Sequence, residues 1–229
     1  MIAGPEPHIL LTEAKKRRNA SRRKLDVTLT SAAGRTDAPP ARFAPTGIAA
    51  LDAALAGGLR RGHLSEAIGA PSTGRTTVVL QAIAAATARG ELAALVDACD
   101  ALDPASAAAA GVDLARLLWV RETGDAARAL KAFSLILQAG GFGLVALDLA
   151  DVAPATVRRF PWTTWMRVAR IVEGSDTVAL LVAGERVARS PAGVTIALES
   201  PAGARWSGTG PRARVFRGLA TSPRIVRAH

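Results

Sequence analysis

Short apolar segments alternate along the chain with longer segments whose apolar residues recur every three or four positions. The short segments predict buried β-strands, and the longer ones predict helices with an apolar face. The expected strands are residues 63–69, 91–99, 114–120, 142–149, 176–184 and 193–200. The expected helices are residues 77–90, 102–111, 124–140 and 154–175, the last with a break at Pro161. Because such strands are joined by right-handed crossovers, the pattern predicts an α/β fold with a mainly parallel central sheet flanked by helices.

The same pattern divides the chain into three parts. Residues 1–46 contain a candidate basic helix at 7–24, followed by a linker rich in Pro, Ala and Gly. Residues 47–200 carry the alternating pattern and form the expected core domain. Residues 201–229 form a basic tail in which Pro and Gly interrupt any long helix.

The excess positive charge lies at the two ends of the chain. Residues 1–44 hold nine Lys and Arg against four Asp and Glu, a net charge of +5. Residues 45–200 hold fourteen against fifteen, a net charge of −1, and residues 201–229 hold six against none. We therefore expect weak, non-specific DNA binding through the basic ends, with solvated, non-binding ends as the alternative. Arginine abundance alone is weak support, because arginines outnumber lysines 25 to 4 throughout the chain.

Composition excludes several classes of protein. The single cysteine, Cys99, excludes an internal disulfide, and the three histidines have no spacing that suits a metal site. No segment approaches the roughly 18 consecutive apolar residues of a membrane span. We therefore expect a cytoplasmic protein that binds neither a metal ion nor a membrane.

The segment GAPSTGRTT, residues 69–77, follows an expected strand and precedes an expected helix. It is close to the phosphate-binding pattern G-x-x-x-x-G-K-[ST], in which backbone N–H groups wrap the phosphates and the lysine reaches the terminal ones. Arg75 stands in the lysine position, and its larger planar guanidinium is not expected to reach the same place. Asp97, Asp100 and Asp148 end neighbouring strands at the edge where such sheets bind ligands. The expected remnant of a nucleotide site consists of Gly69, Gly74, Arg75, Thr76, Thr77 and Asp148.

The order of these motifs resembles the RecA recombinase family over residues 47–200. The tract DALDP, residues 100–104, followed by Gly111-Val112-Asp113, is a specific part of the resemblance. It implies a RecA-like ATP-binding core with a glutamate that activates water. It also implies a Walker B aspartate and a glutamine that senses the γ-phosphate.

The chain departs from that family pattern where hydrolysis depends on it. The glutamate expected before DALDP is Cys99, the lysine is Arg75, and the sensing glutamine aligns with Gly184, so that only Thr76 and Asp148 remain. Loss of one positioned transition-state donor costs about 2.7–4 kcal/mol. We therefore expect no catalytic residue, no ATP hydrolysis and no cofactor. Cys99 has no histidine placed to activate it, and we interpret it as a buried, inert residue.

A second departure concerns DNA. RecA-type filaments hold single-stranded DNA through a long loop after a central strand, and only residues 184–192 stand there in this chain. The four tryptophans do not cluster into a stacking platform, so DNA binding in the recombinase manner is not expected. We interpret Trp162 and Trp165 as core residues on one apolar helix face, with Arg167 and Arg170 on the opposite face.

A RecA-like core without hydrolytic residues, a short DNA loop and two basic ends together resemble the ImuA group, which are RecA-related accessory proteins of bacterial SOS mutagenesis. The resemblance implies a non-catalytic adaptor in translesion DNA synthesis that binds a Y-family polymerase-like subunit, with RecA as a second candidate partner. Two alternatives stay open. One is a weak RecA-family ATPase in DNA repair, and the other is a cell-division inhibitor similar to SulA.

The basic tail carries short apolar groups between its arginines, a pattern typical of a segment that orders on the surface of a partner. The alternative is that residues 215–219, VFRGL, pair along the edge of the sheet and complete the fold. The expected partner-binding residues are Arg212, Arg214, Val215, Phe216, Arg217, Leu219 and Arg224.

Overall fold

A computed structural model describes residues 42–188, 193–198, 203–210, 213–220 and 223–227. The candidate helix at 7–24 and most of the linker lie outside the described residues, as does Arg212. At the start of the described chain, β1 (Phe43–Ala44) pairs antiparallel with β2 (Leu59–Arg60) as a short two-stranded sheet.

The central sheet has seven strands in the order β11-β8-β3-β7-β6-β4-β5. The strands are β3 (His63–Gly69), β4 (Ala93–Asp97), β5 (Leu117–Arg121), β6 (Leu144–Asp148), β7 (Val178–Ala183), β8 (Val194–Leu198) and β11 (Pro223–Arg227). All neighbouring pairs are parallel except β8 and β11, which are antiparallel. The predicted α/β fold with a mainly parallel sheet is therefore confirmed.

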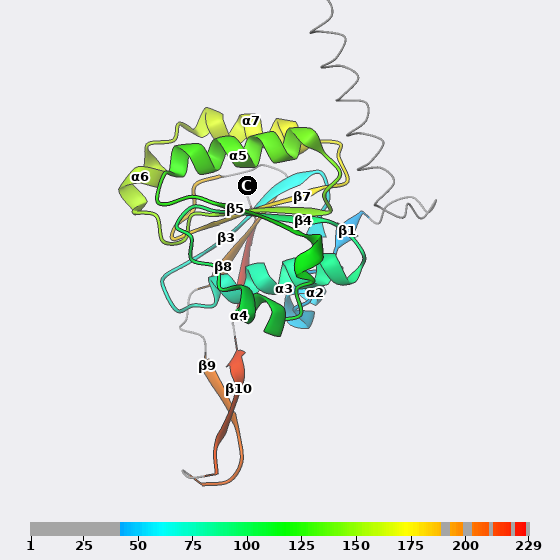
Figure 1. Ribbon diagram of the computed structural model, residues 1–229, viewed down its shortest axis with the longest axis vertical. Helices are drawn as coiled ribbons and strands as arrows, with labels where there is room; N and C mark the ends of the chain where they lie inside the picture. Colours follow the sequence, from blue (N-terminus) through cyan, green and yellow to red (C-terminus); the bar gives the residue numbers. More distant parts are fainter. Residues whose placement is uncertain (1–41, 189–192, 199–202, 211–212, 221–222, 228–229) are drawn as a thin grey trace, which may run out of the picture. The chain divides into compact units, whose positions relative to one another are not determined.

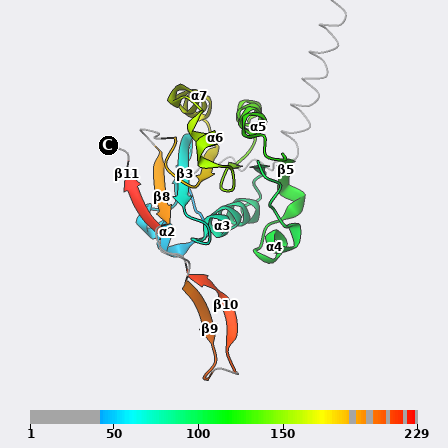
Figure 2. The same cartoon turned by 90° about the vertical axis from the view of Figure 1, so that its left-hand side faces the viewer.

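Helices cover both faces of this sheet (Figures 1 and 2). On one face lie α2 (Ala49–Ala54), α3 (Arg75–Ala88) and α4 (Pro104–Ala109), and on the other α5 (Ala126–Ala139), α6 (Pro154–Arg158) and α7 (Trp162–Val172). A short 3-10 helix, η1 (Leu114–Arg116), precedes β5. Two sheet faces with separate helix layers require two apolar cores.

Local sequence signals set the helix ends. The side chains of Asp103 and Asp125 each accept two backbone N–H groups at the start of α4 and α5, and that of Asp113 accepts one at the start of η1, as expected of N-cap residues. Pro161 separates α6 from α7, because proline removes a backbone donor and clashes with the preceding turn. The predicted break at Pro161 is confirmed.

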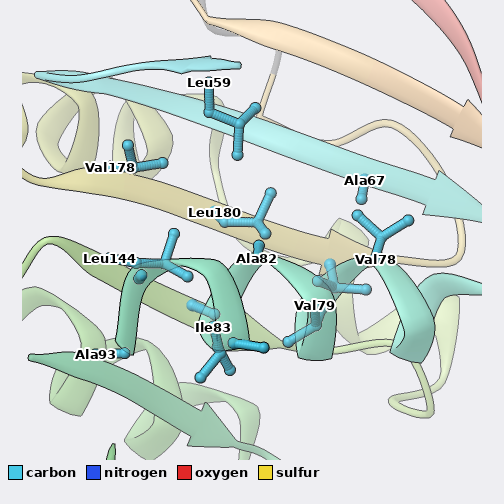
Figure 3. Close-up of a cluster of buried hydrophobic side chains, with 14 of the residues drawn as sticks. Leu59, Ala67, Val78, Val79, Ala82, Ile83, Ala93, Leu144, Val178 and Leu180 are labelled. Carbon is cyan, nitrogen blue, oxygen red and sulfur yellow. The ribbon is translucent and has the colours of Figure 1, made fainter. Parts of the chain in front are cut away.

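The first core packs α3 against the sheet (Figure 3). Val79, Ala82 and Ile83 on the inner side of α3 meet Leu144 and Leu180 on the central strands, and all five are nearly inaccessible to solvent. The small alanines of α3 let the helix approach the sheet closely. The second core lies under α5 and α7, with Phe133 and Trp165 as its largest side chains.

The two tryptophans at the start of α7 differ from the sequence interpretation. Trp165 is 2% exposed and packs in the second core, as predicted, but Trp162 is 59% exposed. Placing Trp162 in the core was therefore wrong. Trp165, Val168 and Val172 share the buried side of α7, and Trp162 lies about 60° from Trp165 around the helix, beyond the edge of that stripe. Arg167 and Arg170 are exposed, as expected.

The C-terminal segment contains three strands, of which the sequence analysis had offered only residues 215–219, as the alternative for the tail. β9 (Gly203–Ser207) and β10 (Val215–Ala220) pair antiparallel as a sheet of their own, with Trp206 opposite Phe216. β11 pairs with β8 and forms an edge of the central sheet. Residues 215–219 therefore pair with β9, and residues 223–227 take the sheet edge instead. The central sheet continues past residue 200, where the sequence pattern had placed the end of the core.

Candidate functional site

The remnant of a nucleotide site lies at the carboxyl ends of the central strands. β3 ends at Gly69, the loop of residues 70–74 follows, and α3 begins at Arg75. Asp148 ends β6 directly opposite Asp97 on β4, because the two residues are register partners. The fold brings the loop and Asp148 to one edge of the sheet, as the sequence predicted.

Packing requires a glycine at position 69, and backbone conformation favours one at position 74. A Cβ on Gly69 would lie 2.5 Å from Thr73 Oγ1 and 2.7 Å from the carbonyl oxygen of Leu198 on β8. Gly74 has φ 98° and is the N-cap of α3, a conformation that other residues rarely adopt. Thr73 Oγ1 donates to the carbonyl oxygen of Ala70 at 2.8 Å and so closes the loop internally.

Arg75 turns into the protein. Its side chain is 7% exposed, its Nη1 donates to the carbonyl oxygen of Ala150 at 2.9 Å, and its Nη2 lies 3.5 Å from Asp151 Oδ1. A Cβ added to Gly184 would lie 3.9 Å from Arg75 Nη1. That distance is ordinary van der Waals contact, so the Arg75 guanidinium lies close to Gly184. Arg75 stands in the position from which the P-loop lysine would contact a terminal phosphate. Its guanidinium is instead bound by Ala150 and Asp151, in the segment after β6.

The cost of burying the Asp148 carboxylate is only partly offset by its neighbours. Burial, together with the neighbouring charges of Asp97 and Asp151, raises its pKa to about 6. The bond that Ala150 N donates to Asp148 Oδ1 at 2.8 Å and the charge of Arg75 oppose this rise. The ionised carboxylate lacks a fully compensating cation among these residues.

We expect Asp148→Asn to increase the free energy of unfolding at neutral pH by on the order of 2 kcal/mol, and to change it little near pH 4. The folded pKa of about 6 lies above the unfolded value of about 3.9, so ionisation costs stability as the pH rises through that window. Asparagine has no charge to desolvate, and its carbonyl oxygen still accepts from Ala150 N. Urea unfolding at both pH values measures the difference. Destabilisation at neutral pH, or an equal effect at both, would contradict the assignment.

The position before the DALDP tract carries no base. Burial raises the pKa of the half-buried Cys99 thiol, and the charges of Asp151, Asp148 and Asp97 raise it further, so the thiol stays protonated. Asp97 accepts from Leu102 N at 2.8 Å and from Trp119 Nε1 at 3.3 Å. This carboxylate is therefore committed to the turn that follows β4.

The two threonines after Arg75 remain near solvent. Thr76 is exposed and Thr77 is half-buried, both in the first turn of α3. Thr76 therefore keeps an accessible hydroxyl at the helix N-terminus, where backbone N–H groups favour anions. Among the described residues no group of three or more His, Cys, Asp or Glu side chains suits a metal ion. The same part of the chain has no helix long and apolar enough to cross a membrane.

Sequence reasoning missed Glu66, a buried acid in the middle of β3. Its side chain accepts from Val187 N at 3.1 Å, Ala188 N at 2.9 Å and Thr195 Oγ1 at 2.8 Å. Arg186 Nε lies 3.4 Å from Glu66 Oε1. Glu66 thereby fastens the segment after Gly184 to the sheet. The signal was a lone acid within an apolar strand, which requires buried donors. Ala150 and Asp151, which hold Arg75, left no signal in the sequence.

The expected partner-binding residues divide between two sheets. Val215, Phe216, Arg217 and Leu219 belong to β10, and Arg224 belongs to β11 in the central sheet. Val215 is 53% exposed, and Arg214 just before it is exposed as well. The structure therefore presents part of the predicted set on the β9–β10 hairpin and part on the sheet edge.

This chain is similar to curated RecA proteins over about half its length. RecA of Frankia casuarinae is 42% identical over 111 residues, which are 48% of this chain and 32% of that protein. RecA of Mycolicibacterium gilvum is 42% identical over 111 residues, covering 48% and 31%, and RecA of Mycobacterium ulcerans is 43% identical over 110 residues, covering 48% and 32%. The chain therefore spans about a third of the length of these relatives.

Among solved structures, a crystal structure of the RadB recombinase is similar, with a TM-score of 0.48 and 19% identity over 61% of this chain and 69% of that one. The family model of the RecA N-terminal domain matches residues 30–158. Because this match covers more than half of the 229 residues, the chain belongs to the RecA N-terminal domain family.

Proposed function

We propose that this RecA-family protein is a non-catalytic accessory factor of SOS-induced mutagenic translesion DNA synthesis, as in the ImuA group. It acts as an adaptor that binds a Y-family polymerase-like subunit, with RecA as a second candidate partner. DNA contributes only weak, non-specific contacts through the basic ends of the chain.

The position of Arg75 carries the proposal. A working P-loop needs a free cation above the loop, and here the guanidinium is 7% exposed and bonded to the carbonyl oxygen of Ala150. The absent side chain at Gly184 and the protonated thiol at Cys99 remove the sensing and water-activating groups that the RecA family would supply. ATP and Mg²⁺ therefore do not fit the residues present as a hydrolytic site. We infer that the RecA-like fold serves here through surfaces that bind partner proteins.

We expect no measurable ATP turnover from the purified full chain, and no rescue by Arg75→Lys, since a lysine restores one cation but no water-activating carboxylate. Phosphate release is measured for the original chain, for Arg75→Lys and for Thr76→Ala, which lacks the accessible hydroxyl. Turnover that Thr76→Ala abolishes would overturn the proposal and favour a weak RecA-family ATPase instead. The exposed Thr76 and the retained Asp148 are the observations in favour of that alternative.

The β9–β10 hairpin is the proposed contact for the polymerase-like subunit. Arg214 and Val215 are exposed on it, and an exposed apolar group beside a cation suits a partner surface. The central sheet keeps its edge strand β11 even if the hairpin changes. Contact through the hairpin and folding of the core can therefore be tested separately.

Arg214→Ser with Val215→Ser is expected to weaken binding of the co-expressed polymerase-like subunit about tenfold or more, because the proposed contact loses a cation and an apolar side chain. The melting temperature should stay unchanged, because both side chains are exposed. Co-purification and calorimetry measure the two effects. The matched control is Arg128→Ser with Leu135→Ser, a similar exposed pair on α5. If the hairpin variant binds the polymerase-like subunit with full affinity, the hairpin is not the contact.

A further inference from the structure

The outer side of α6 and α7 carries unpaired positive charge. Residues 154–172 contain four arginines and no acid. Arg158 is paired, since its Nη1 lies 3.0 Å from Glu185 Oε1. Arg159, Arg167 and Arg170 are exposed, and within the described part of the chain none of them lies within ion-pair distance of a carboxylate.

An exposed tryptophan lies among these arginines. Trp162 begins α7 and is 59% exposed, whereas Trp165, one turn later, is 2% exposed. Met166 and Arg170 follow Trp162 at intervals of four residues, so the three side chains form one stripe along the helix. We call Arg159, Trp162, Met166, Arg167 and Arg170 the Arg–Trp face.

The inner side of α7 keeps this face in place. Trp165, Val168 and Val172 anchor the helix in the second core, and Phe160 packs edge-on against Trp165 with ring centroids 6.1 Å apart. The indole of Trp162 therefore stays in water on a helix that cannot turn to bury it. A large apolar side chain in that position is stabilised when a partner covers it, because apolar surface is then removed from water.

We propose that the Arg–Trp face binds an acidic segment of a protein partner, with an apolar side chain of that segment packed on Trp162. Tryptophan and arginine are the residues most enriched at the energetic centres of protein interfaces. Two exposed arginines on α7 and one just after α6, none within ion-pair distance of a described carboxylate, are complementary to carboxylates that flank an apolar anchor. The inference goes beyond the proposed function, because it does not depend on the identity of the polymerase-like subunit.

The geometry favours a protein segment over single-stranded nucleic acid. Single-strand binders stack successive bases on several aromatic side chains, and among the described residues of α6 and α7 only Trp162 is an exposed aromatic. Phe160 is half-buried against Trp165 and is not free to stack. One indole followed by Met166 forms a small apolar strip, which suits the side chains of a short peptide.

A library of displayed random dodecapeptides, selected on the immobilised full chain, tests the inference. We expect enriched peptides in which Asp and Glu flank a large apolar residue. Trp162→Ala, and separately Arg167→Glu with Arg170→Glu, should each weaken these peptides about tenfold or more. The control, Arg128→Glu with Leu135→Ala on the neighbouring helix, should leave their binding unchanged.

A second test exchanges the charges of the Arg–Trp face and of the peptide. Peptides with Lys in place of Asp and Glu should bind the Arg167→Glu, Arg170→Glu variant better than they bind the original chain. The inference is overturned if no acidic peptide is enriched, or if the enriched peptides bind all variants equally. It is also overturned if the same substitutions weaken oligodeoxythymidylate binding while leaving the peptides unaffected. Unchanged melting temperatures confirm that the substituted surfaces remain folded.

Discussion

Trp165→Ala is expected to lower the free energy of unfolding by about 3–5 kcal/mol, the usual cost of truncating a large buried aromatic side chain. Trp165 is 2% exposed and fills the space between α7 and the central sheet. Its ring also meets Phe160 edge-on, with an angle of 86° between the two planes. Removing the indole leaves a cavity that α7 can close only by moving against β3, so the loss should be large.

Trp162→Ala is the matched control for this prediction. The residue type and helix are the same, but Trp162 is 59% exposed, so its truncation should change stability by no more than about 0.5 kcal/mol. Urea unfolding of the two variants, followed by far-UV circular dichroism, measures the difference. Similar losses in the two variants would mean that α7 is rotated relative to the arrangement described above. The Arg–Trp face would then have to be redefined.

Glu66→Ala is expected to destabilise the protein by about 3–5 kcal/mol, comparable to the loss of one partner from a buried charged network. Three donors lose their acceptor together, namely Val187 N, Ala188 N and Thr195 Oγ1. Arg186 also loses the carboxylate that lies 3.4 Å from its Nε. Each unsatisfied buried donor costs about 1–3 kcal/mol, although these losses are not additive.

Two further substitutions show which property of Glu66 matters. Glu185→Ala breaks an exposed ion pair with Arg158 and should cost at most about 1 kcal/mol. Glu66→Gln keeps the size of the side chain but turns one acceptor into a donor, so it should fall between the two alanine variants. If Glu66→Ala costs no more than Glu185→Ala, the carboxylate does not hold the segment after Gly184 in place.

The Glu66 network bears on the proposed function. It holds residues 186–188, shortly after Gly184, against Glu66 on β3. Buried hydrogen bonds therefore fix the chain just after Gly184, the position at which the RecA family would supply a sensing glutamine.

The sequence by itself determined the alternating order of strands and helices and the parallel sheet. Strands buried on both faces must be apolar along their whole length, so β4, β6 and β7 appear as continuous apolar segments. Local chemistry fixed several ends as well, since Pro161 cannot continue a helix and Gly74 is suited to the left-handed turn before α3. The sequence also indicated that the loop lacks the usual lysine, because Arg75 stands in the lysine position of the motif.

Tertiary structure decided which side of each element is covered and where long side chains point. Trp162 and Trp165 are chemically identical, and only the packing of α7 on the sheet buries one and leaves the other in water. Arg75 finds its acceptor at Ala150, 75 residues away, and no local pattern encodes such a contact. The edge strand β11 was missed for the same reason. Its polar and apolar residues form a strand only because β8 offers unpaired backbone groups beside them.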